Sequence, residues 1–272
     1  MIKKLSDLIV RKLVKGVCPD HGEFTAEEIW LGNSRVVTAK CPECERVRRG
    51  IEAEERRKRE EEDRIRRAEE ARIESLRSMN IPKEYWGKLF DSYIPQNASQ
   101  QTALEVAKRF VKGWDKASAG GYGLFFIGSC GTGKTHLACA VMQSLMSSRR
   151  LESRYLRIAD LIQHIRSSWR QDSEESDATI IRRYVDLPLL VIDELGVQAG
   201  SDNEQQLLFQ IVDSRLSECR PTIFISNLSA QSIATVIGER LADRIQSKSV
   251  PLVIAGQSMR KPLSADVFNL ED

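Results

Sequence analysis

The sequence lacks any long hydrophobic run. Its apolar stretches all fall short of the roughly 20 residues that a membrane-spanning helix needs. Residues 1–16 do not contain the core of a secretory signal, because Arg11, Lys12 and Lys15 interrupt them. We therefore expect no membrane association and a cytoplasmic location, where the six cysteines would stay reduced and free to bind metal.

A strong net charge is also absent. The 41 Lys and Arg residues nearly balance the 39 Asp and Glu residues, which leaves a formal net charge of +2. Such a weak overall field does not by itself attract nucleic acid, so any contact with DNA must come from local basic patches. A chain of 272 residues is long for one domain and short for three.

What is present is a glycine-rich octapeptide that matches the phosphate-binding pattern G-x-x-x-x-G-K-[ST] at every fixed position. The apolar run 123–127 before it indicates a buried strand, and 134–146 after it has apolar residues at helical spacing. A helix that begins at such a loop directs its positive dipole end at a phosphate. We predict that ATP binds here, with Lys134 reaching the β- and γ-phosphates and the Thr135 hydroxyl on Mg²⁺. The predicted nucleotide-binding residues are Gly128, Ser129, Cys130, Gly131, Thr132, Gly133, Lys134, Thr135 and His136.

A second nucleotide signature follows further along the chain. An apolar strand is predicted over 187–192, and it ends in the adjacent carboxylates Asp193 and Glu194. At the end of a central strand beside the phosphate loop, Asp193 would hold Mg²⁺ directly or through water. Glu194 would polarise the attacking water as a general base. Together with the phosphate loop, this pair predicts ATP hydrolysis.

Polar residues further downstream could complete the site. A strand predicted to begin at Pro221 ends with Asn227, which could orient water against the γ-phosphate or could merely begin a turn. Arg240 and Arg244 lie one helical turn apart, where they could make ordinary ion pairs or reach a neighbouring subunit's nucleotide. After a last short strand, Arg260 could contact the γ-phosphate of its own subunit.

Four potential metal ligands occur as two closely spaced pairs near the N-terminus. Cys18 and His21 have C-x-x-H spacing, and Cys41 and Cys44 have C-x-x-C spacing, with room for a small hairpin between the pairs. This is the ligand set of a tetrahedral Cys₃His zinc site. A segment this short cannot bury enough apolar area to fold alone, so Zn²⁺ binding would supply folding free energy. Because protein fills all four positions, we predict a structural role.

Composition predicts three regions. Residues 1–46 combine an amphipathic basic helix over 1–16 with the zinc module; the helix could pack within its own module, dock on a protein partner or lie on a membrane surface. Residues 47–79 have alternating Glu and Arg runs that favour a solvated linker helix supported by i,i+4 ion pairs. Residues 80–272 would form the ATPase domain, entered after the helix break at Ile81-Pro82.

Other stretches are less diagnostic. The aromatic-rich stretch 85–93 could cover the adenine ring or form part of the core. The acidic and polar stretch 171–178 indicates a loop. The remaining predicted elements are helices over 102–114, 159–169 and 203–216 and strands over 154–158 and 252–254.

Taken in order, these motifs resemble those of the DnaC/IstB-type AAA+ ATPases. The resemblance covers roughly residues 80–262 and rests on the segments 128–138, 191–196, 225–228 and 238–244. The preceding pairs of zinc ligands look like those of phage and prophage DnaC-like replication proteins. The IstB branch generally has a helical N-terminal region without a zinc module.

The resemblance implies an α/β fold, namely an AAA+ P-loop αβα core with a five-stranded parallel sheet, preceded by a small zinc-binding domain and a charged linker helix. It implies that Asn227 is sensor 1 and Arg260 is sensor 2. It also implies that Arg244, with Arg240 as the second choice, is the arginine finger that acts on a neighbouring subunit. The implied cofactors are ATP, Mg²⁺ and Zn²⁺.

By the same resemblance, the protein is expected to be an ATP-dependent loader of the replicative hexameric DNA helicase in replication initiation. Its partners would be a DnaB-type helicase gripped by the N-terminal module, single-stranded DNA, and further copies of the chain in an ATP-bridged oligomer. Lys108, Arg109 and Lys112 are candidate DNA contacts. Two other functions stay open: an IstB-like transposition helper ATPase, and a nucleotide-gated adaptor with little turnover.

Overall fold

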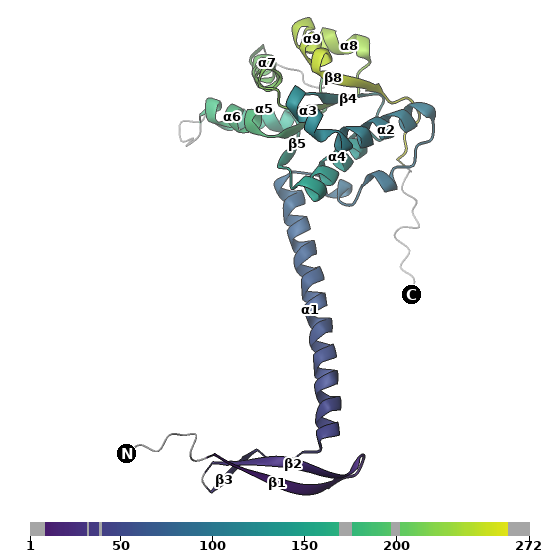
Figure 1. Ribbon diagram of the computed structural model, residues 1–272. Helices are drawn as coiled ribbons and strands as arrows, with labels where there is room; N and C mark the ends of the chain where they lie inside the picture. The colour runs from purple at the N-terminus through teal and green to yellow at the C-terminus, as the bar shows by residue number, and fades with distance from the viewer. Residues whose placement is uncertain (1–8, 32, 38–39, 169–175, 197–201, 261–272) are drawn as a thin grey trace, which may run out of the picture. The chain divides into compact units, whose positions relative to one another are not determined.

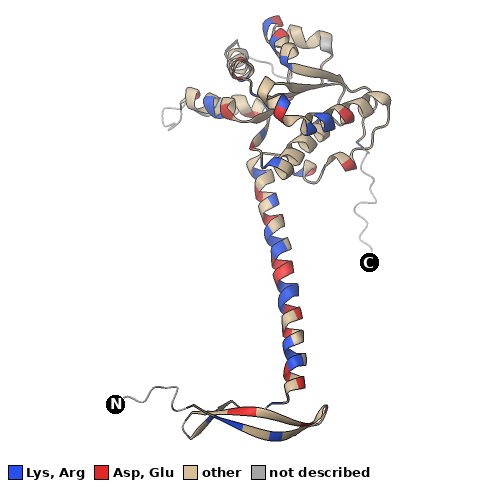
Figure 2. Cartoon of the chain, in the orientation of Figure 1, with Lys and Arg blue, Asp and Glu red and all other residues tan. Residues whose placement is uncertain are grey.

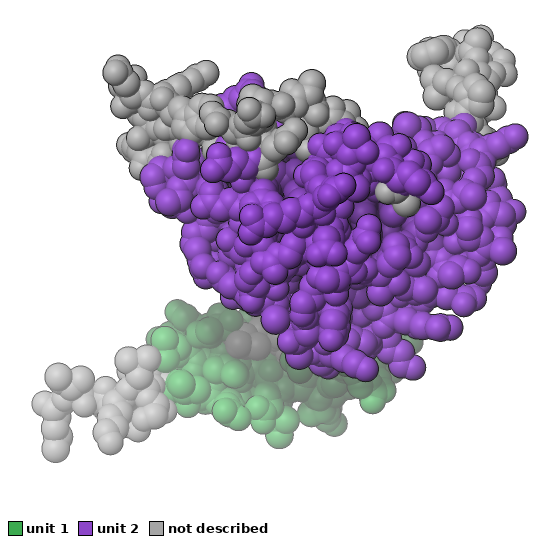
Figure 3. Space-filling view, turned by 90° about the horizontal axis from the view of Figure 1, so that it is seen from above, with its two compact units in different colours: residues 1–71 green, residues 72–272 purple. Residues whose placement is uncertain are grey.

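The structure is a computed structural model that describes residues 9–31, 33–37, 40–168, 176–196 and 202–260. It divides into two compact units, Met1–Ala71 and Arg72–Asp272, which Figure 3 shows in different colours. The helices among the described residues include none that is long and apolar enough to cross a membrane.

The first unit contains a small antiparallel sheet with the strand order β1-β2-β3 (Figure 1). Strand β1 (Ile9–Cys18) pairs along its whole length with β2 (Gly22–Leu31). Strand β3 (Ser34–Val37) pairs with the other edge of β2, so these two strands form the hairpin expected between the two pairs of zinc ligands. The tight turn between β1 and β2 ends at Gly22, whose φ of 75° is a conformation that glycine adopts without steric cost.

The helix predicted over 1–16 is wrong for the part of the chain that the structure describes, because residues 9–16 lie in β1. The rest of the predicted helix lies outside the described residues. The apolar pair Ile9 and Leu13 fits either structure, since residues four apart share a face in a helix and in a strand. Pairing with β2 decides that this segment is a strand, and residues 9–16 alone do not reveal that pairing. The three valines of β1 also favour a strand, because they are β-branched.

A single long helix, α1 (Pro42–Ser78), follows the sheet and begins earlier than the predicted linker. Proline is well tolerated in the first helical turn, where its missing N–H costs nothing. The helix surface carries i,i+3 and i,i+4 ion pairs, such as Lys58 with Glu54 at 3.2 Å, and Figure 2 shows both charge signs along it. Such exposed pairs contribute about 0.2–0.5 kcal/mol each. The helix is therefore supported by many weak local interactions.

The second unit is built on a five-stranded parallel sheet. Its strands are β4 (Gly123–Ile127), β5 (Ser153–Arg157), β6 (Leu189–Asp193), β7 (Thr222–Ser226) and β8 (Ser249–Val253), in the order β5-β6-β7-β4-β8. All four neighbouring pairs are parallel, which confirms the predicted AAA+ type of core. Every residue of β4, β6 and β7 is buried, as expected for a sheet covered on both faces.

Helices form the two outer layers of this unit (Figure 1). They are the short 3-10 turns η2 (Lys83–Tyr85) and η3 (Phe90–Ser92) and the helices α2 (Ala98–Lys112), α3 (Trp114–Gly120), α4 (Lys134–Arg149), α5 (Ile158–Ser168), α6 (Asp177–Asp186), α7 (Asp202–Ser217), α8 (Ala230–Ile237) and α9 (Glu239–Lys248). Leu124 and Phe126 of β4 belong to one core with α2, α3 and α4. Phe125 and Ile127 belong to a second core with α5 to α9. Each fully buried large apolar side chain contributes about 1.5–3 kcal/mol.

Helices α3, α6 and α8 were not predicted, and α6 lies partly where a loop was expected. The stretch 171–178, predicted as a loop, contains the start of α6 at Asp177, while residues 169–175 lie outside the described residues. Ser176 caps this helix by accepting a hydrogen bond from the N–H of Thr179 at 3.3 Å. A charged, polar stretch is also what a helix N-terminus favours, because the cap needs a side-chain oxygen and the dipole favours a carboxylate.

The aromatic stretch 85–93 contains the last residue of η2 and the whole of η3. Tyr93 is buried, and Tyr85, Trp86 and Phe90 pack against the core that includes α2 and α4. The indole N–H of Trp86 donates to the carbonyl of Ile81 at 2.8 Å. These contacts show the core role for the stretch, and its contact with adenine stays a prediction.

Candidate nucleotide site and metal centre

The phosphate loop lies between the end of β4 and the start of α4. Gly128, Gly131 and Gly133 have positive φ angles of 153°, 77° and 90°. A Cβ atom at Gly131 would lie 2.1 Å from the Ser258 hydroxyl, and one at Gly128 would lie 2.2 Å from the carbonyl oxygen of Ile254. Both the backbone angles and the space therefore require glycine here, because any side chain would force the loop open.

Lys134 is the first residue of α4 and is only 5% exposed. Its Nζ donates hydrogen bonds to the carbonyl oxygens of Gly128 at 2.8 Å and Ser129 at 2.7 Å. Burial lowers the pKa of Lys134, while the nearby Cys130 and Asp193 oppose that shift. A buried cation is costly unless it is paired, so an anionic group bound in this loop would be strongly stabilised.

Thr135 and Asp193 are far apart in the sequence, yet the Thr135 hydroxyl donates to Asp193 Oδ2 at 3.0 Å. Asp193 ends β6, which is separated from β4 by β7 alone. The C-terminal ends of parallel strands meet at one edge of the sheet, where the phosphate loop also lies. Hydroxyl and carboxylate oxygens are the hard ligands that Mg²⁺ prefers, so the two side chains fit that ion.

Glu194 follows Asp193 with a left-handed backbone, at φ 64°. Its N–H donates to Asp193 Oδ1 at 2.7 Å. A non-glycine residue in this conformation costs about 1–3 kcal/mol unless its surroundings hold it. Here the next residue, Leu195, donates to the carbonyl of Ile225 at 2.9 Å and accepts from the Ser226 hydroxyl at 2.7 Å. Strain held in this way beside a carboxylate supports a functional role for Glu194.

Asn227 directly follows β7, the neighbour of β4. The N–H of Gly128 donates to the carbonyl of Ser226 at 3.2 Å, so Asn227 is adjacent to the phosphate loop. Its side chain is exposed. This position agrees with the predicted orientation of water, and the role stays a prediction.

Arg260 lies on the segment after β8, close to the phosphate loop. The N–H of the preceding residue, Met259, donates to the carbonyl of Gly131 at 2.8 Å. The neighbouring Tyr85 hydroxyl raises the pKa of Arg260, while burial raises the pKa of Tyr85 and the nearby Arg260 and Thr135 oppose that rise. Arg260 therefore lies beside the nucleotide site of its own chain, where a sensor 2 residue would act, and that role stays a prediction.

His136 contacts the aromatic stretch 85–93, which precedes the first strand of the parallel sheet. Its Nε2 lies 2.9 Å from the Leu89 carbonyl oxygen and 3.3 Å from the Ser92 hydroxyl, and its ring packs edge-on against Tyr93. Burial lowers the pKa of His136. The residue thus fixes the phosphate-loop helix against this segment, and a direct contact with the nucleotide stays a prediction.

The two candidate arginine fingers on α9 are held within their own chain. Arg244 donates to Asp213 Oδ1 at 2.6 Å and to the Ser217 hydroxyl at 3.1 Å. Arg240 lies over the ring of Phe209, 4.9 Å from its centroid. The Arg244 side chain is 42% exposed, so a neighbouring subunit could still reach it. Both assignments stay predictions.

Two tyrosines near the site were missing from the predicted set. Tyr85 lies close enough to Arg260 to change its pKa, as described above, and the Tyr155 hydroxyl donates to Asp193 Oδ2 at 2.7 Å. Tyr155 belongs to β5, and its contact depends on β5 lying next to β6. No local pattern reports that adjacency, so the sequence offered no signal for Tyr155.

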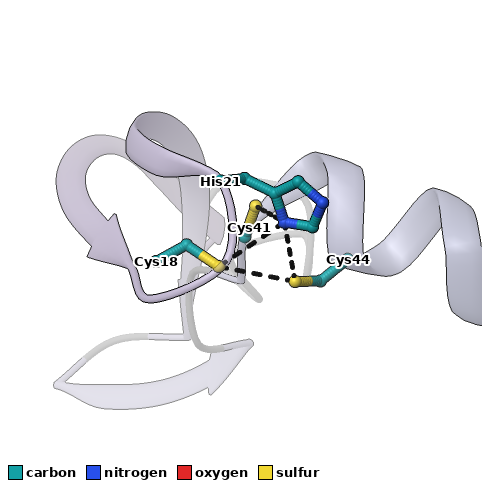
Figure 4. A group of neighbouring side chains, drawn as sticks. All are labelled: Cys18, His21, Cys41 and Cys44. Carbon is teal, nitrogen blue, oxygen red and sulfur yellow. Dashed lines mark hydrogen bonds between the residues drawn. The ribbon is translucent and has the colours of Figure 1, made fainter.

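The four predicted zinc ligands converge (Figure 4). Cys18 ends β1, His21 lies in the turn before β2, Cys41 directly precedes α1, and Cys44 lies in its first turn. His21 Nδ1 lies 3.6, 3.8 and 3.3 Å from the sulfur atoms of Cys18, Cys41 and Cys44, and the sulfur atoms of Cys18 and Cys44 are 3.5 Å apart. All four ligand atoms lie within 4.8 Å of one another.

These distances are close to the edges of a tetrahedron around Zn²⁺. Zn–S bonds of about 2.3 Å and Zn–N bonds of about 2.0 Å place ligand atoms about 3.5–3.8 Å apart. Hydrogen bonds from the backbone of Asp20 and from His21 lower the pKa of Cys18 to about 6, whereas hydrogen bonding to Cys18 raises the pKa of Cys44 to about 12. The lowered pKa favours the thiolate form of Cys18, and the thiolate is the form that binds metal. The donor set fits a structural Zn²⁺.

The chain matches the family described as "IstB-like ATP binding protein" over residues 117–266, more than half of its length. It is 33% identical over 157 residues to the replicative helicase loader DnaC of Escherichia coli K12, covering 58% of this chain and 62% of that protein. It is 34% identical over 156 residues to the uncharacterized protein YdaV of the same strain, covering 57% of this chain and 60% of that protein. The chain thus spans about three fifths of the length of these relatives.

A solved structure is also similar. The crystal structure of the DnaC helicase loader aligns with a TM-score of 0.59 and 28% identity, covering 64% of this chain and 100% of that chain. The matched residues 117–266 contain the phosphate loop, the adjacent Asp193 and Glu194 and all three arginines discussed above. The chain therefore belongs to the family of IstB-like ATP-binding proteins, and its second unit is an AAA+ domain of the DnaC/IstB type.

Proposed function

We propose that the chain is an ATP-dependent loader of a replicative DNA helicase onto single-stranded DNA. One observation carries the proposal: the chain that brings Thr135, Asp193 and Glu194 together beside the phosphate loop aligns with the full length of the chain in a crystal structure of the DnaC helicase loader. Membership of the family supports nucleotide use in general. The loading step and the partners are our proposal.

The residues of the site would divide the work of ATP hydrolysis. Lys134 and the loop N–H groups bind the phosphates, and Thr135 and Asp193 hold Mg²⁺, which supplies positive charge against the phosphate oxygens. Glu194 accepts the proton of the attacking water as general base. Asn227 orients that water.

The remaining residues would connect hydrolysis to assembly. Arg260 contacts the nucleotide of its own chain, while Arg244, or Arg240 in its place, contacts that of a neighbouring copy. The zinc module within residues 1–46 grips a DnaB-type hexameric helicase, residues 47–79 link it to the ATPase domain over 80–272, and the oligomer of ATPase domains holds single-stranded DNA through its phosphates. Hydrolysis then releases the assembly.

A loading assay tests this function. The full chain is mixed with the host replicative helicase, circular single-stranded DNA and ATP, and the helicase retained on the DNA is measured. We expect the wild type to raise retention and Lys134→Ala to abolish the increase. Cys41→Ser should lose helicase binding but keep ATP turnover, whereas Cys219→Ser, at an exposed cysteine outside both sites, should change neither. Glu194→Gln should still bind ATP and lose turnover about 10²–10⁴-fold.

Other outcomes would favour the alternative functions. The family description names IstB. A wild-type protein that does not bind the helicase but assembles with a transposase on duplex DNA would therefore support a transposition helper. Equal, negligible turnover in the wild type and Glu194→Gln would instead support a nucleotide-gated adaptor.

A further inference from the structure

Tyr155 is a buried polar residue close to the nucleotide site. It lies in β5, its side chain is packed into the core that includes α4, and it is 5% exposed. Its hydroxyl donates to Asp193 Oδ2 at 2.7 Å. Its backbone N–H donates to the carbonyl of Met79, just after α1, at 2.8 Å. Hydrogen bonds therefore hold both the backbone and the hydroxyl of Tyr155 in place.

The strand register explains why Tyr155 makes this contact. Arg157, two residues further along β5, is the register partner of Asp193. The Arg157 side chain is turned instead to Asp160, with Nε 3.1 Å from Oδ2. Tyr155 reaches Asp193 diagonally across the strand pair, as a long aromatic side chain can.

Three donors converge on the Asp193 carboxylate. Thr135 and Tyr155 both donate to Oδ2, and the N–H of Glu194 donates to Oδ1. Together they fix the rotation of the carboxylate about its last bond. Burial, followed by the charge of Asp193, raises the pKa of Tyr155, so the hydroxyl stays a neutral donor. Thr135 and Glu194 already belong to the proposed hydrolysis machinery, whereas Tyr155 has no other assigned role.

We propose that Tyr155 is a positioning residue that holds the Asp193 carboxylate in the orientation in which it binds a divalent cation. This inference rests on the proposed role of Asp193 as a magnesium ligand. It does not depend on helicase loading, DNA binding or turnover. Partners that orient a metal ligand from behind typically change metal affinity about 10–100-fold when they are removed.

The test is a Mg²⁺ titration of nucleotide binding by the full chain. A fluorescent ATP analogue reports binding, and the Mg²⁺ concentration at half-saturation is measured for the wild type and Tyr155→Phe. The Phe variant keeps the buried ring and loses only the hydroxyl. We expect it to need about 10–100-fold more Mg²⁺, while the small affinity for the analogue in EDTA stays unchanged.

Tyr184→Phe is the matched control. Tyr184 is 6% exposed and lies in the same unit, and its hydroxyl is 2.9 Å from His164 Nδ1. We expect Tyr184→Phe to leave the Mg²⁺ requirement within about twofold of the wild type, because the hydroxyl that it loses has a different partner. Thermal midpoints without nucleotide show how much each variant loses through packing and hydrogen bonding alone.

Two results would overturn the proposal. One is a Mg²⁺ requirement of Tyr155→Phe within twofold of the wild type, or a shift matched by Tyr184→Phe. The other is nucleotide binding by the wild type that does not respond to Mg²⁺, since Asp193 would then hold no cation. A protein that fails to load helicase but shows the expected Mg²⁺ shift would refute the loader function and leave the role of Tyr155 intact.

Discussion

In the described part of the first unit, Cys18 and Cys41 are among the few buried apolar side chains, each 7% exposed, while Leu13 and Val17 on β1 are about three-quarters exposed. In the second unit, side chains such as Phe126 are completely buried, in two cores on opposite faces of a parallel sheet. The described part of the first unit therefore lacks a hydrophobic core of this kind, and we expect bound Zn²⁺ to stabilise it instead. On this expectation the two units of the chain have different sources of stability.

Loss of the metal should give the largest difference between the two units. We expect Cys41→Ser, or chelation of the wild type, to unfold the β1–β3 sheet, since structural Zn²⁺ supplies about 10–16 kcal/mol in small modules. The second unit should keep its thermal midpoint and its nucleotide affinity. Bound zinc by elemental analysis and limited proteolysis of residues 9–41 measure the effect. Retention of a protease-resistant module in the metal-free chain would contradict it.

Removal of Arg215 should give the next largest effect, a loss of stability in the second unit. Arg215 is fully buried, and its guanidinium donates to the carbonyls of Tyr184, Val185, Leu187 and Pro221 at 2.6–3.1 Å. It thereby ties the end of α6 to the start of β7. Arg215→Met would remove the guanidinium donor from all four buried carbonyls, and we expect the free energy of unfolding to fall by about 3–5 kcal/mol.

The matched control for Arg215 is Arg182→Met. Arg182 is exposed and pairs with Asp186 and Glu218, so its removal should cost less than about 1 kcal/mol. Denaturant unfolding of both variants, followed in the second unit, measures the difference. Zinc content should be the same in the two variants. Equal losses would show that the Arg215 network contributes no more than a surface ion pair.

Features that depend on a local sequence pattern could be predicted from the sequence, whereas features that depend on contacts between distant elements could not. The phosphate loop, the adjacent Asp193 and Glu194 and the four candidate zinc ligands are local patterns, and their spacing alone indicates their chemistry. The helix predicted over 1–16 is wrong in its described part, residues 9–16, because Ile9 and Leu13 fit two periodicities and the pairing of β1 with β2 decides between them. Tyr155 and Arg215 act across neighbouring elements, so no local pattern shows their partners.

The zinc affinity of the first unit should depend on pH. Zn²⁺ must displace the proton of Cys44, whose pKa is raised to about 12 by its hydrogen bond to Cys18, so zinc affinity should rise about tenfold or more for each pH unit above pH 6. Below pH 6, the pKa of Cys18, that thiolate is also protonated and the loss of affinity becomes steeper. Competition with a chromophoric chelator from pH 5 to 8 measures both slopes. A flat profile would show that no thiol proton is displaced.

The linker helix α1 relies on neither metal nor core over most of its length, and it should give the smallest effect. Lys58 pairs with Glu54 at 3.2 Å, and both side chains are about 70% exposed. Lys58→Glu replaces this attraction with repulsion, and we expect α1 to lose about 0.5 kcal/mol locally at low salt. Hydrogen exchange of the amides around residue 58 should speed up accordingly, while zinc content and unfolding of the second unit stay unchanged.

The salt dependence of that small effect identifies its cause. Exposed charges are screened within about 3 Å at 1 M salt, so the difference between Lys58→Glu and the wild type should largely vanish there. Lys58→Gln, which removes the pair without adding repulsion, should fall between them at low salt and match both at high salt. A difference that persists in 1 M salt would mean that α1 depends on packing at this position, and the helix would then resemble the second unit in its source of stability.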